Sequence, residues 1–276
     1  MKKLLVCGSN GMAGHTISDY LKSLNKYEII NVARSNADYN LDIEFDLNYL
    51  KDLIKTLKPD VVINCIGLLV KASNDNPERA IYINSYFPKW LEKVTKNTQT
   101  KIIHLSTDCV FNGLSNGNYI ETDIPTETNN YGRTKSMGEL NNSKNLTLRL
   151  SIIGDEEKSN GVGLFEWFMR QKGDIKGYSN VLWNGITTLE LAKQIDEIIN
   201  LDINLVGLYH LAPSFNISKF DLLYLIKEIF EKEIAIGSDP TVIQDKTLHN
   251  SRTFEYNPLI PSYEQQLMEM KEWLGK

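Results

Sequence analysis

The sequence is poor in cysteine, and its cysteines do not form the patterns of a disulfide framework or a metal cluster. Three occur in 276 residues, at Cys7, Cys65 and Cys109. Three cysteines without close pairing predict buried, reduced thiols. The four histidines also lack the spacing of metal ligands. We therefore expect no metal site.

Long apolar runs and an excess of positive charge are also missing. No run approaches the roughly 20 residues of a membrane span, and the Met-Lys-Lys start leads into a strand rather than a signal peptide. The formal net charge is −5, which does not favour nucleic-acid binding. The hydrophobic (42%) and charged (24%) fractions are typical of a globular protein. Together these features predict a cytoplasmic protein with neither a membrane nor a nucleic-acid partner.

A glycine-rich loop lies between the first predicted strand and the first predicted helix. An apolar strand over 2–7 leads into Gly8-Ser-Asn-Gly11-Met-Ala-Gly14, and a helix follows to about Leu24. In this order the glycines permit a tight turn, close approach to a pyrophosphate and close packing of helix on strand. The phosphates then lie at the positive end of the helix. We predict a dinucleotide site whose loop residues are Gly8, Asn10, Gly11, Met12 and Gly14.

The stretch 105–139 carries the residues that we expect to be catalytic. An apolar strand ends at Ser106-Thr107-Asp108, and a later helix carries Tyr131 and Lys135. Residues four apart share a helix face, so the phenol and the ammonium should lie side by side. A neighbouring ammonium lowers the pKa of a phenol, which would make Tyr131 a general acid near neutral pH. The Thr107 hydroxyl could bind the same substrate oxygen.

Strand and helix patterns alternate as far as residue 153. This alternation predicts an α/β fold with a doubly wound parallel sheet of the Rossmann type. We expect residues 1–153, together with about 182–212, to form the dinucleotide-binding domain. Residues 154–181 and 213–276 should form a smaller substrate-binding part. A single long helix is expected over 77–96, and capped helices should begin after Thr187 and Ser218.

The glycine spacing, the Ser-Thr-Asp strand end and the Tyr131–Lys135 pair together resemble the extended short-chain dehydrogenase/reductase superfamily. The segments STDCVF, YIETD-P and YGRTKSMGE resemble the dTDP-4-dehydrorhamnose reductase family more closely. The resemblance runs from residue 2 to about Ala212, and more loosely beyond. It implies that Thr107, Tyr131 and Lys135 are the catalytic residues of a reductase that uses a nicotinamide cofactor.

Further cofactor contacts follow from the strand ends. The second strand ends at Arg34-Ser35, where a guanidinium and a hydroxyl suit a 2′-phosphate, so we expect NADPH to be preferred, with NADH also accepted. By resemblance, 41–46 is the next strand, and Asp46 and Leu47 flank the adenine. The segment Cys65-Ile66-Gly67 resembles the one that passes the cofactor ribose.

The resemblance also implies contacts with the substrate. The residues concerned are Asp108, Val110, Phe111, Asn84, Trp183 and Asn184. For Asn84 a structural role, bonding backbone near the active site, is an equal alternative. Trp183 and Asn184 stand where relatives carry a segment resembling Asp-Gln, so the identity of the bound sugar stays open at this point.

The resemblance implies a reductase of a nucleotide-activated 4-keto-6-deoxyhexose, which makes a deoxysugar precursor for a surface polysaccharide. Three alternatives remain: a UDP-2-acetamido-2,6-dideoxy-4-hexulose as substrate, an additional epimerase activity, and a non-catalytic regulatory subunit like that of methionine adenosyltransferase. The intact Thr107, Tyr131 and Lys135 set favours catalysis over the last. The helices expected over 77–96 and 129–143 resemble those that pair in many dimers of the superfamily, so a homodimer is one expected assembly.

Overall fold

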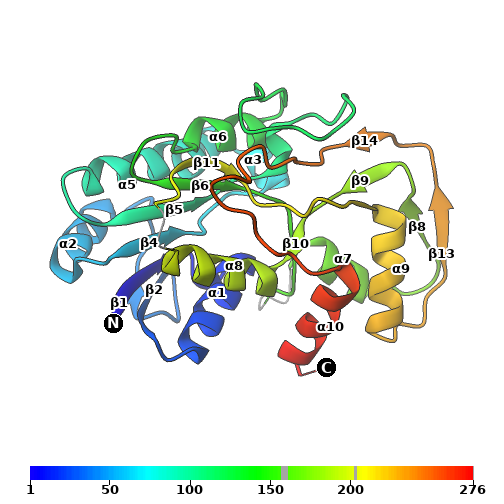
Figure 1. The fold of residues 1–276 in the computed structure, drawn as a ribbon, viewed down its shortest axis with the longest axis horizontal. Helices are drawn as coiled ribbons and strands as arrows, with labels where there is room; N and C mark the ends of the chain where they lie inside the picture. The colour runs from blue at the N-terminus through cyan, green and yellow to red at the C-terminus, as the bar shows by residue number, and fades with distance from the viewer. Residues whose placement is uncertain (157–160, 202–203, 276) are drawn as a thin grey trace.

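A parallel sheet forms the centre of the protein (Figure 1). The computed structural model describes residues 1–156, 161–201 and 204–275. Within them the main sheet has seven strands in the order β11-β6-β5-β4-β1-β2-β3, and every neighbouring pair is parallel. Their bounds are β1 (Lys2–Cys7), β2 (Tyr27–Ala33), β3 (Tyr39–Asn40), β4 (Val61–Asn64), β5 (Lys101–Leu105), β6 (Leu146–Arg149) and β11 (Gly207–His210). The strand order reverses direction between β1 and β4, which confirms the predicted doubly wound Rossmann-type sheet.

Helices cover both faces of this sheet, and β1 shows why. Its side chains alternate between the faces. Leu4 and Val6 pack with α1 (Met12–Ser23) and α8 (Thr188–Asn200), whereas Leu5 and Cys7 pack with α2 (Leu47–Leu57) and α5 (Phe87–Thr95). A strand segment that is buried on both faces is expected to be mainly apolar, as residues 4–7 of β1 and 61–63 of β4 are.

The helical segment before α5 differs from the single helix expected over 77–96. After α3 (Val70–Asp75), a short α4 (Pro77–Ala80) leads into the π-helical stretch η1 (Ile81–Tyr86), which continues into α5. Pro88 lacks the N–H that an α-helix would direct at the carbonyl of residue 84. This missing donor favours the wider π turns there, and such turns are frequent at functional sites.

A smaller group of elements lies beyond the carboxyl ends of the main strands, at the right of Figure 1. Its strands form three small sheets, β10-β7, β12-β9-β14 and β13-β8. The bounds are β7 (Ile152–Ile153), β8 (Ile175–Tyr178), β9 (Val181–Trp183), β10 (Ile186–Thr187), β12 (Ile217–Ser218), β13 (Ile236–Asp239) and β14 (Gln244–Asp245); the helices are α7 (Leu164–Arg170), α9 (Lys219–Ile229) and α10 (Tyr263–Trp273). These helices share one apolar cluster, which includes Phe165, Leu222 and Leu267. The exact division of the chain into domains stays a prediction.

Two local expectations have opposite outcomes. The N-caps Thr187 and Ser218 are confirmed, because each hydroxyl accepts a hydrogen bond from the backbone N–H three residues on. The strand expected over 41–46 is wrong: only Tyr39–Asn40 pairs with β2. Within 41–46 the Asp46 carboxylate accepts from the Asp42 N–H at 2.8 Å, and this local bond turns the chain into α2.

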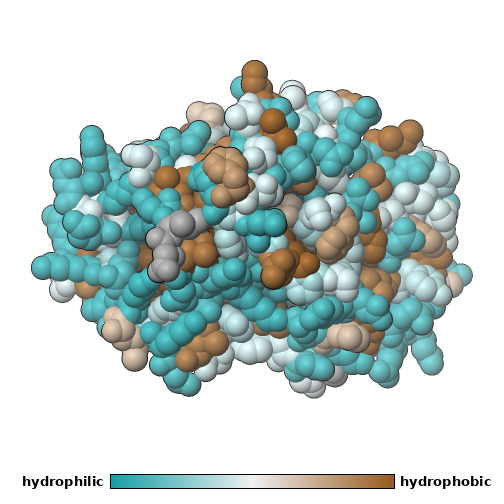
Figure 2. All heavy atoms as spheres, viewed as in Figure 1, coloured by the Kyte–Doolittle hydropathy of each residue, from teal (hydrophilic) through white to brown (hydrophobic). Residues whose placement is uncertain are grey.

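The face of the molecule seen in Figure 2 is mostly hydrophilic, with hydrophobic residues in separate patches. None of the described helices is long and apolar enough to cross a membrane. Exposed apolar side chains do occur on the helices that were expected to pair in a dimer, at Ile81 (50% exposed), Tyr86 (48%) and Met137 (64%). The homodimer itself stays a prediction.

Helix α1 can pack against the end of β1 only because residue 14 has no side chain. A Cβ on Gly14 would lie 2.0 Å from the Gly8 carbonyl oxygen. Gly8 itself has φ +84°, which disfavours other residues, and a Cβ there would meet Ile66 at 2.9 Å. These two positions therefore set the distance between strand, loop and helix.

Gly14→Ala should destabilise the protein and weaken nicotinamide cofactor binding. The added methyl group must push α1 away from the loop, and overpacking of this kind costs about 1–3 kcal/mol. Urea denaturation and cofactor titration measure the two effects. Gly237→Ala is the control, because it is exposed and a Cβ there meets its nearest atom at 3.8 Å. Equal stability of the two variants would contradict the packing argument.

Candidate active site

The glycine loop presents unoccupied backbone donors at the start of α1. Gly8 N–H is held by the Val32 carbonyl at 2.8 Å, and the Asn10 amide donates to the Ser35 carbonyl at 2.5 Å. Gly11 is the N-cap of α1 and supplies no side-chain cap. The first N–H groups of the helix therefore have no side-chain cap from Gly11 within the described parts of the chain, and with the helix dipole they suit a phosphate. Met12, also predicted here, lies against the position that a Cβ of Gly163 would take.

The end of β2 lies beside this loop. Arg34 and Ser35 are both exposed, and Ser35 is tied to the glycine loop through Asn10. Among the described residues, Arg34 has no hydrogen bond or ion pair, so its guanidinium is available to a ligand. Asp46 is partly buried and holds the turn before α2, where Leu47 begins the helix.

The segment that follows β4 lies between the glycine loop and the catalytic helix. Cys65 N–H donates to the Cys7 carbonyl at 3.0 Å, and Ile66 N–H donates to the Asn64 side chain at 3.1 Å. Gly67 is exposed, and a Cβ there would lie 3.8 Å from the Lys135 Nζ. The segment is therefore placed beside Lys135, as expected of one that passes a cofactor ribose.

Strand β5 and helix α6 (Asn130–Gly138) bring the three expected catalytic residues together. Thr107 follows β5, and the next residue is fixed by a hydrogen bond from Asp108 N–H to the Leu150 carbonyl at 3.1 Å. The start of α6 lies close to η2 (Asp108–Val110), since a Cβ on Gly132 would lie 2.3 Å from the Cys109 carbonyl oxygen. This contact places the Tyr131 phenol within hydrogen-bond reach of the Thr107 hydroxyl. The Thr107 hydroxyl also donates to Asp108 Oδ1 at 3.0 Å.

The expected lowering of the Tyr131 pKa by Lys135 is wrong. Burial raises the pKa of the phenol, the nearby Cys109 and Asp108 add to the rise, and the hydrogen bond with Thr107 only partly opposes it. The Lys135 ammonium donates to the Leu105 carbonyl at 2.7 Å. Burial lowers its own pKa to about 8, against the opposing attraction of Glu139 and Cys65. The phenol therefore stays protonated at neutral pH, which is the form that a proton donor requires.

Asn84 takes the structural role that the sequence left open. Its side chain is 1% exposed and sits in the π-helical stretch. The amide oxygen accepts from Leu68 N–H at 2.8 Å, and the amide nitrogen donates to the Leu68 carbonyl at 3.0 Å and to Thr134 Oγ1 at 3.2 Å. The Asn84 amide thus has its hydrogen-bond partners inside the protein. These bonds connect the segment after β4 to α6. The contact of Asn84 with substrate stays a prediction.

Four other predicted substrate contacts are buried in the protein. Val110 and Phe111 are 0% exposed, and Phe111 stacks on Tyr119 with ring centroids 4.0 Å apart. Trp183 is 5% exposed and donates to Ser151 Oγ at 2.7 Å. Asn184 is 7% exposed and bonds the backbone of Leu248 and Pro213. The side chains of these four residues therefore belong to the interior of the protein. Of the predicted substrate contacts, Asp108 is the one that is bonded to Thr107.

Sequence reasoning missed Lys219, the first residue of α9. Its Nζ lies 4.7 Å from the centroid of the Trp183 ring, and Asp108 and Cys109 act on it electrostatically. The available signal was its position, because a positive charge at the first turn of a helix is unfavourable.

A buried ion pair connects the end of α6 with the strand end before Thr107. Arg149 Nε and Nη2 each donate to the Glu139 carboxylate at 2.7 Å, and Ser106 Oγ donates to Glu139 Oε1 at 2.7 Å. Arg149 also contacts His210 Nε2 at 3.3 Å. Burial and Arg149 lower the pKa of His210 to about 4, although Glu121 opposes the shift. The neutral imidazole can therefore accept from the guanidinium.

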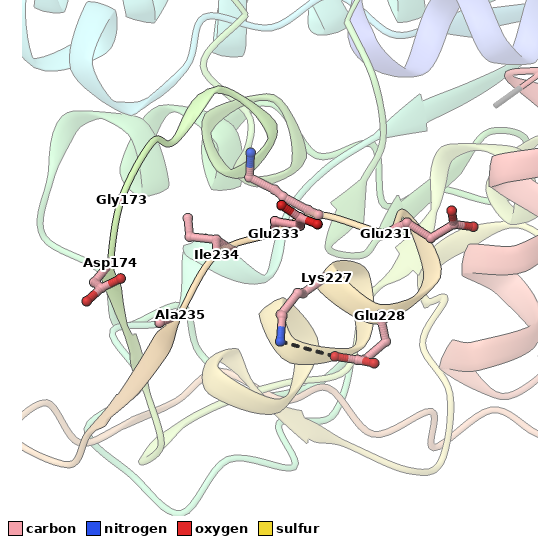
Figure 3. Close-up of a pocket in the computed structure, with 9 residues that line it drawn as sticks. Gly173, Asp174, Lys227, Glu228, Glu231, Glu233, Ile234 and Ala235 are labelled. Atoms are coloured by element: carbon pink, nitrogen blue, oxygen red, sulfur yellow. Dashed lines mark ion pairs between the residues drawn. The ribbon is translucent and has the colours of Figure 1, made fainter.

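A surface hollow of about 600 Å³ lies away from these residues, between the end of α9 and the β8–β13 pair (Figure 3). Its lining is mainly charged, and Lys227 pairs with Glu228 at 3.3 Å. No group of three or more histidine, cysteine or acidic residues in the described parts of the chain could hold a metal ion. The hollow contains none of the expected catalytic residues.

Comparison with known proteins agrees with this geometry. The model of the RmlD substrate binding domain matches residues 1–248. The chain belongs to the RmlD substrate binding domain family. Together with the reductases described next, this match confirms the predicted oxidoreductase.

Individual relatives span nearly the same length. "Probable low-salt glycan biosynthesis reductase Agl14" of Haloferax volcanii is 28% identical over 269 residues, covering 88% of this chain and 83% of that protein. A dTDP-4-dehydrorhamnose reductase of Aggregatibacter actinomycetemcomitans is 26% identical, covering 85% and 80%. A crystal structure of dTDP-4-dehydrorhamnose reductase from Bacillus anthracis in complex with NADP aligns with TM-score 0.84, 20% identity and 99% coverage of both chains. The likeness supports the Rossmann-type fold of this chain.

Arg149→Leu should lower the free energy of unfolding by about 3–5 kcal/mol, because the Glu139 carboxylate remains buried without its partner. The double variant Arg149→Leu/Glu139→Leu removes both charges and should lose less. Urea denaturation of wild type and both variants measures the difference. A double variant less stable than the single one would show that packing, not the unpaired charge, dominates.

Proposed function

We propose that the protein is an NADPH-dependent reductase of a nucleotide-activated 4-keto-6-deoxyhexose. The observation that carries the proposal is the assembly of Thr107, Tyr131 and Lys135 at the carboxyl edge of the sheet, beside the glycine loop. Ligands of doubly wound sheets bind at this edge. The reduced deoxysugar would serve as a precursor for surface polysaccharide.

Tyr131 is the proton donor in this proposal. Its raised pKa keeps the phenol protonated until negative charge develops on the substrate oxygen. The Thr107 hydroxyl lies within reach of the phenol and would hydrogen-bond the same oxygen, which polarises the carbonyl. In the protein alone the Thr107 hydroxyl donates its single proton to Asp108, so on substrate binding it would turn that proton from the carboxylate to the substrate oxygen.

The residues around the glycine loop fit a dinucleotide. The free N–H groups at the start of α1 would hold the pyrophosphate, and the segment at Gly67 with the Lys135 ammonium would hold the nicotinamide ribose. Arg34 and Ser35, with Asp46 and Leu47 further on, would flank the adenosine end. When bound, the nicotinamide supplies the hydride.

A screen of NADPH oxidation tests the substrate class. The panel contains dTDP-, UDP- and GDP-linked 4-keto-6-deoxy sugars and a UDP-2-acetamido-2,6-dideoxy-4-hexulose. We expect turnover with the dTDP-linked 4-keto sugar or a related member of the panel. A protein that binds NADPH but reduces none of them would instead be placed with the non-catalytic regulatory subunits.

Tyr131→Phe should reduce kcat by ~10²–10⁴, the range for loss of a general acid, with the Kd for NADPH nearly unchanged. Tyr119→Phe is the matched control: its buried hydroxyl has no hydrogen-bond partner among the described residues, so the variant should keep wild-type turnover. Steady-state rates and cofactor titration measure both effects. Wild-type turnover in Tyr131→Phe would remove the phenol from the mechanism.

Arg34→Ala should reduce the preference for NADPH over NADH by about 10–100-fold, because one charge-assisted hydrogen bond contributes roughly 1.5–3 kcal/mol. The ratio of kcat/KM for the two cofactors is the measurement. Arg133→Ala, which changes an exposed arginine on α6, should leave the ratio unaltered. A preference of the wild type for NADH would contradict this assignment, and Arg34 would then be a solvated surface residue.

A further inference from the structure

Lys219 is presented to the catalytic segment from the C-terminal elements. It is the first residue of α9, whose N-cap is Ser218. Its ammonium lies over the Trp183 ring, and the negative charge that attracts it is that of Asp108, directly after Thr107. The side chain therefore connects the smaller group of elements with the catalytic edge of the sheet.

This position is unfavourable for a lysine in the protein alone. The partial positive charge of a helix N-terminus repels an ammonium. Burial lowers the pKa of Lys219 to about 8, although Asp108 and Cys109 attract the charged form. No hydrogen bond or ion pair to the ammonium is present within the described ranges. The Lys219 side chain is partly buried, and a partly buried ammonium without a bonded partner is unfavourable. A ligand that completes its bonding would explain its presence.

The other lysines near the catalytic segment already have partners. Lys246, which also acts on Cys109, forms an ion pair with Glu127 at 3.3 Å. Lys135 donates to the Leu105 carbonyl and lies on the side of Gly67, where the cofactor is expected. Among the residues that the structure describes near Asp108, Lys219 is thus an ammonium without a bonded partner, on the side away from the proposed cofactor.

We propose that Lys219 binds the diphosphate of the nucleotide-activated substrate. The inference rests on the proposed function, in which the substrate is a nucleotide sugar. In a neutral hexose joined to a nucleotide, the diphosphate alone carries full negative charge. A protonated, partner-free ammonium matches that group better than it matches a sugar hydroxyl. The Trp183 ring holds the ammonium in place through a cation–π contact.

Binding of dTDP, UDP and inorganic pyrophosphate to the protein saturated with NADP⁺ tests this assignment, because saturation keeps the probes out of the cofactor site. Isothermal titration calorimetry should show about tenfold weaker binding of the diphosphate probes to Lys219→Met, and Lys219→Arg should recover most of the affinity. Lys227→Met is the matched control, since Lys227 lies on the same helix but lines the hollow of Figure 3. It should bind as wild type does.

Thermal unfolding of the same variants without ligand gives a second measurement. Removal of an unpaired ammonium should leave Lys219→Met folded, with a Tm raised by about 2–4 °C. Equal affinity of wild type and Lys219→Met for the diphosphate probes would overturn the proposal. A raised KM for the keto sugar with unchanged diphosphate affinity would also overturn it, because Lys219 would then contact the sugar. If NADPH binds but no keto sugar of the panel is reduced, the proposed function fails. The affinities for the diphosphate probes still decide whether Lys219 binds a diphosphate.

Discussion

The buried ion pair between Arg149 and Glu139 is the contact on which the catalytic arrangement depends. Glu139 closes α6, Arg149 ends β6, and Ser106 bonds the same carboxylate just before Thr107. One carboxylate therefore fixes the end of the Tyr131–Lys135 helix against the strand end that carries Thr107. Two charges taken out of water are retained only where their geometry is good, and here both guanidinium contacts measure 2.7 Å. The relative position of helix and strand end is correspondingly well defined.

The network continues from Arg149 into the C-terminal part of the chain. His210 contacts Arg149 through Nε2 and bonds the carbonyls of Tyr119 and His249 through Nδ1. Burial would raise the pKa of Glu121, but its hydrogen bonds with Ser251 and the His210 N–H outweigh that effect and lower it. Segments near residues 120, 210 and 250 are thereby joined beneath the site. This connection explains how elements distant in sequence can support one set of proposed catalytic residues.

Burial, more than pairing, sets the protonation of the groups at the site. It raises the pKa of Tyr131 and lowers those of Lys135 and Lys219 to about 8. A protonated phenol is a competent proton donor, and lysines whose pKa lies near 8 remain mainly charged at neutral pH. The unfavourable burial is confined to these groups, since the neighbouring side chains of Asn84 and Ser106 are hydrogen-bonded. Such concentration of unfavourable charge is typical of functional sites.

The sequence by itself determined the sheet, the glycine loop and the spacing of the proposed catalytic residues, because these depend on local patterns. Alternating apolar segments specify a parallel sheet, glycine is required where Gly8 has positive φ and Gly14 meets a carbonyl, and Tyr131 and Lys135 share a helix face by their spacing alone. Tertiary structure decided what depends on burial and on distant partners. Val110, Phe111, Trp183 and Asn184 belong to the interior, Asn84 bonds Leu68 and Thr134, and the pKa of Tyr131 rises. No local pattern reveals these outcomes, because desolvation and hydrogen bonding are set by residues that folding brings together from far along the chain.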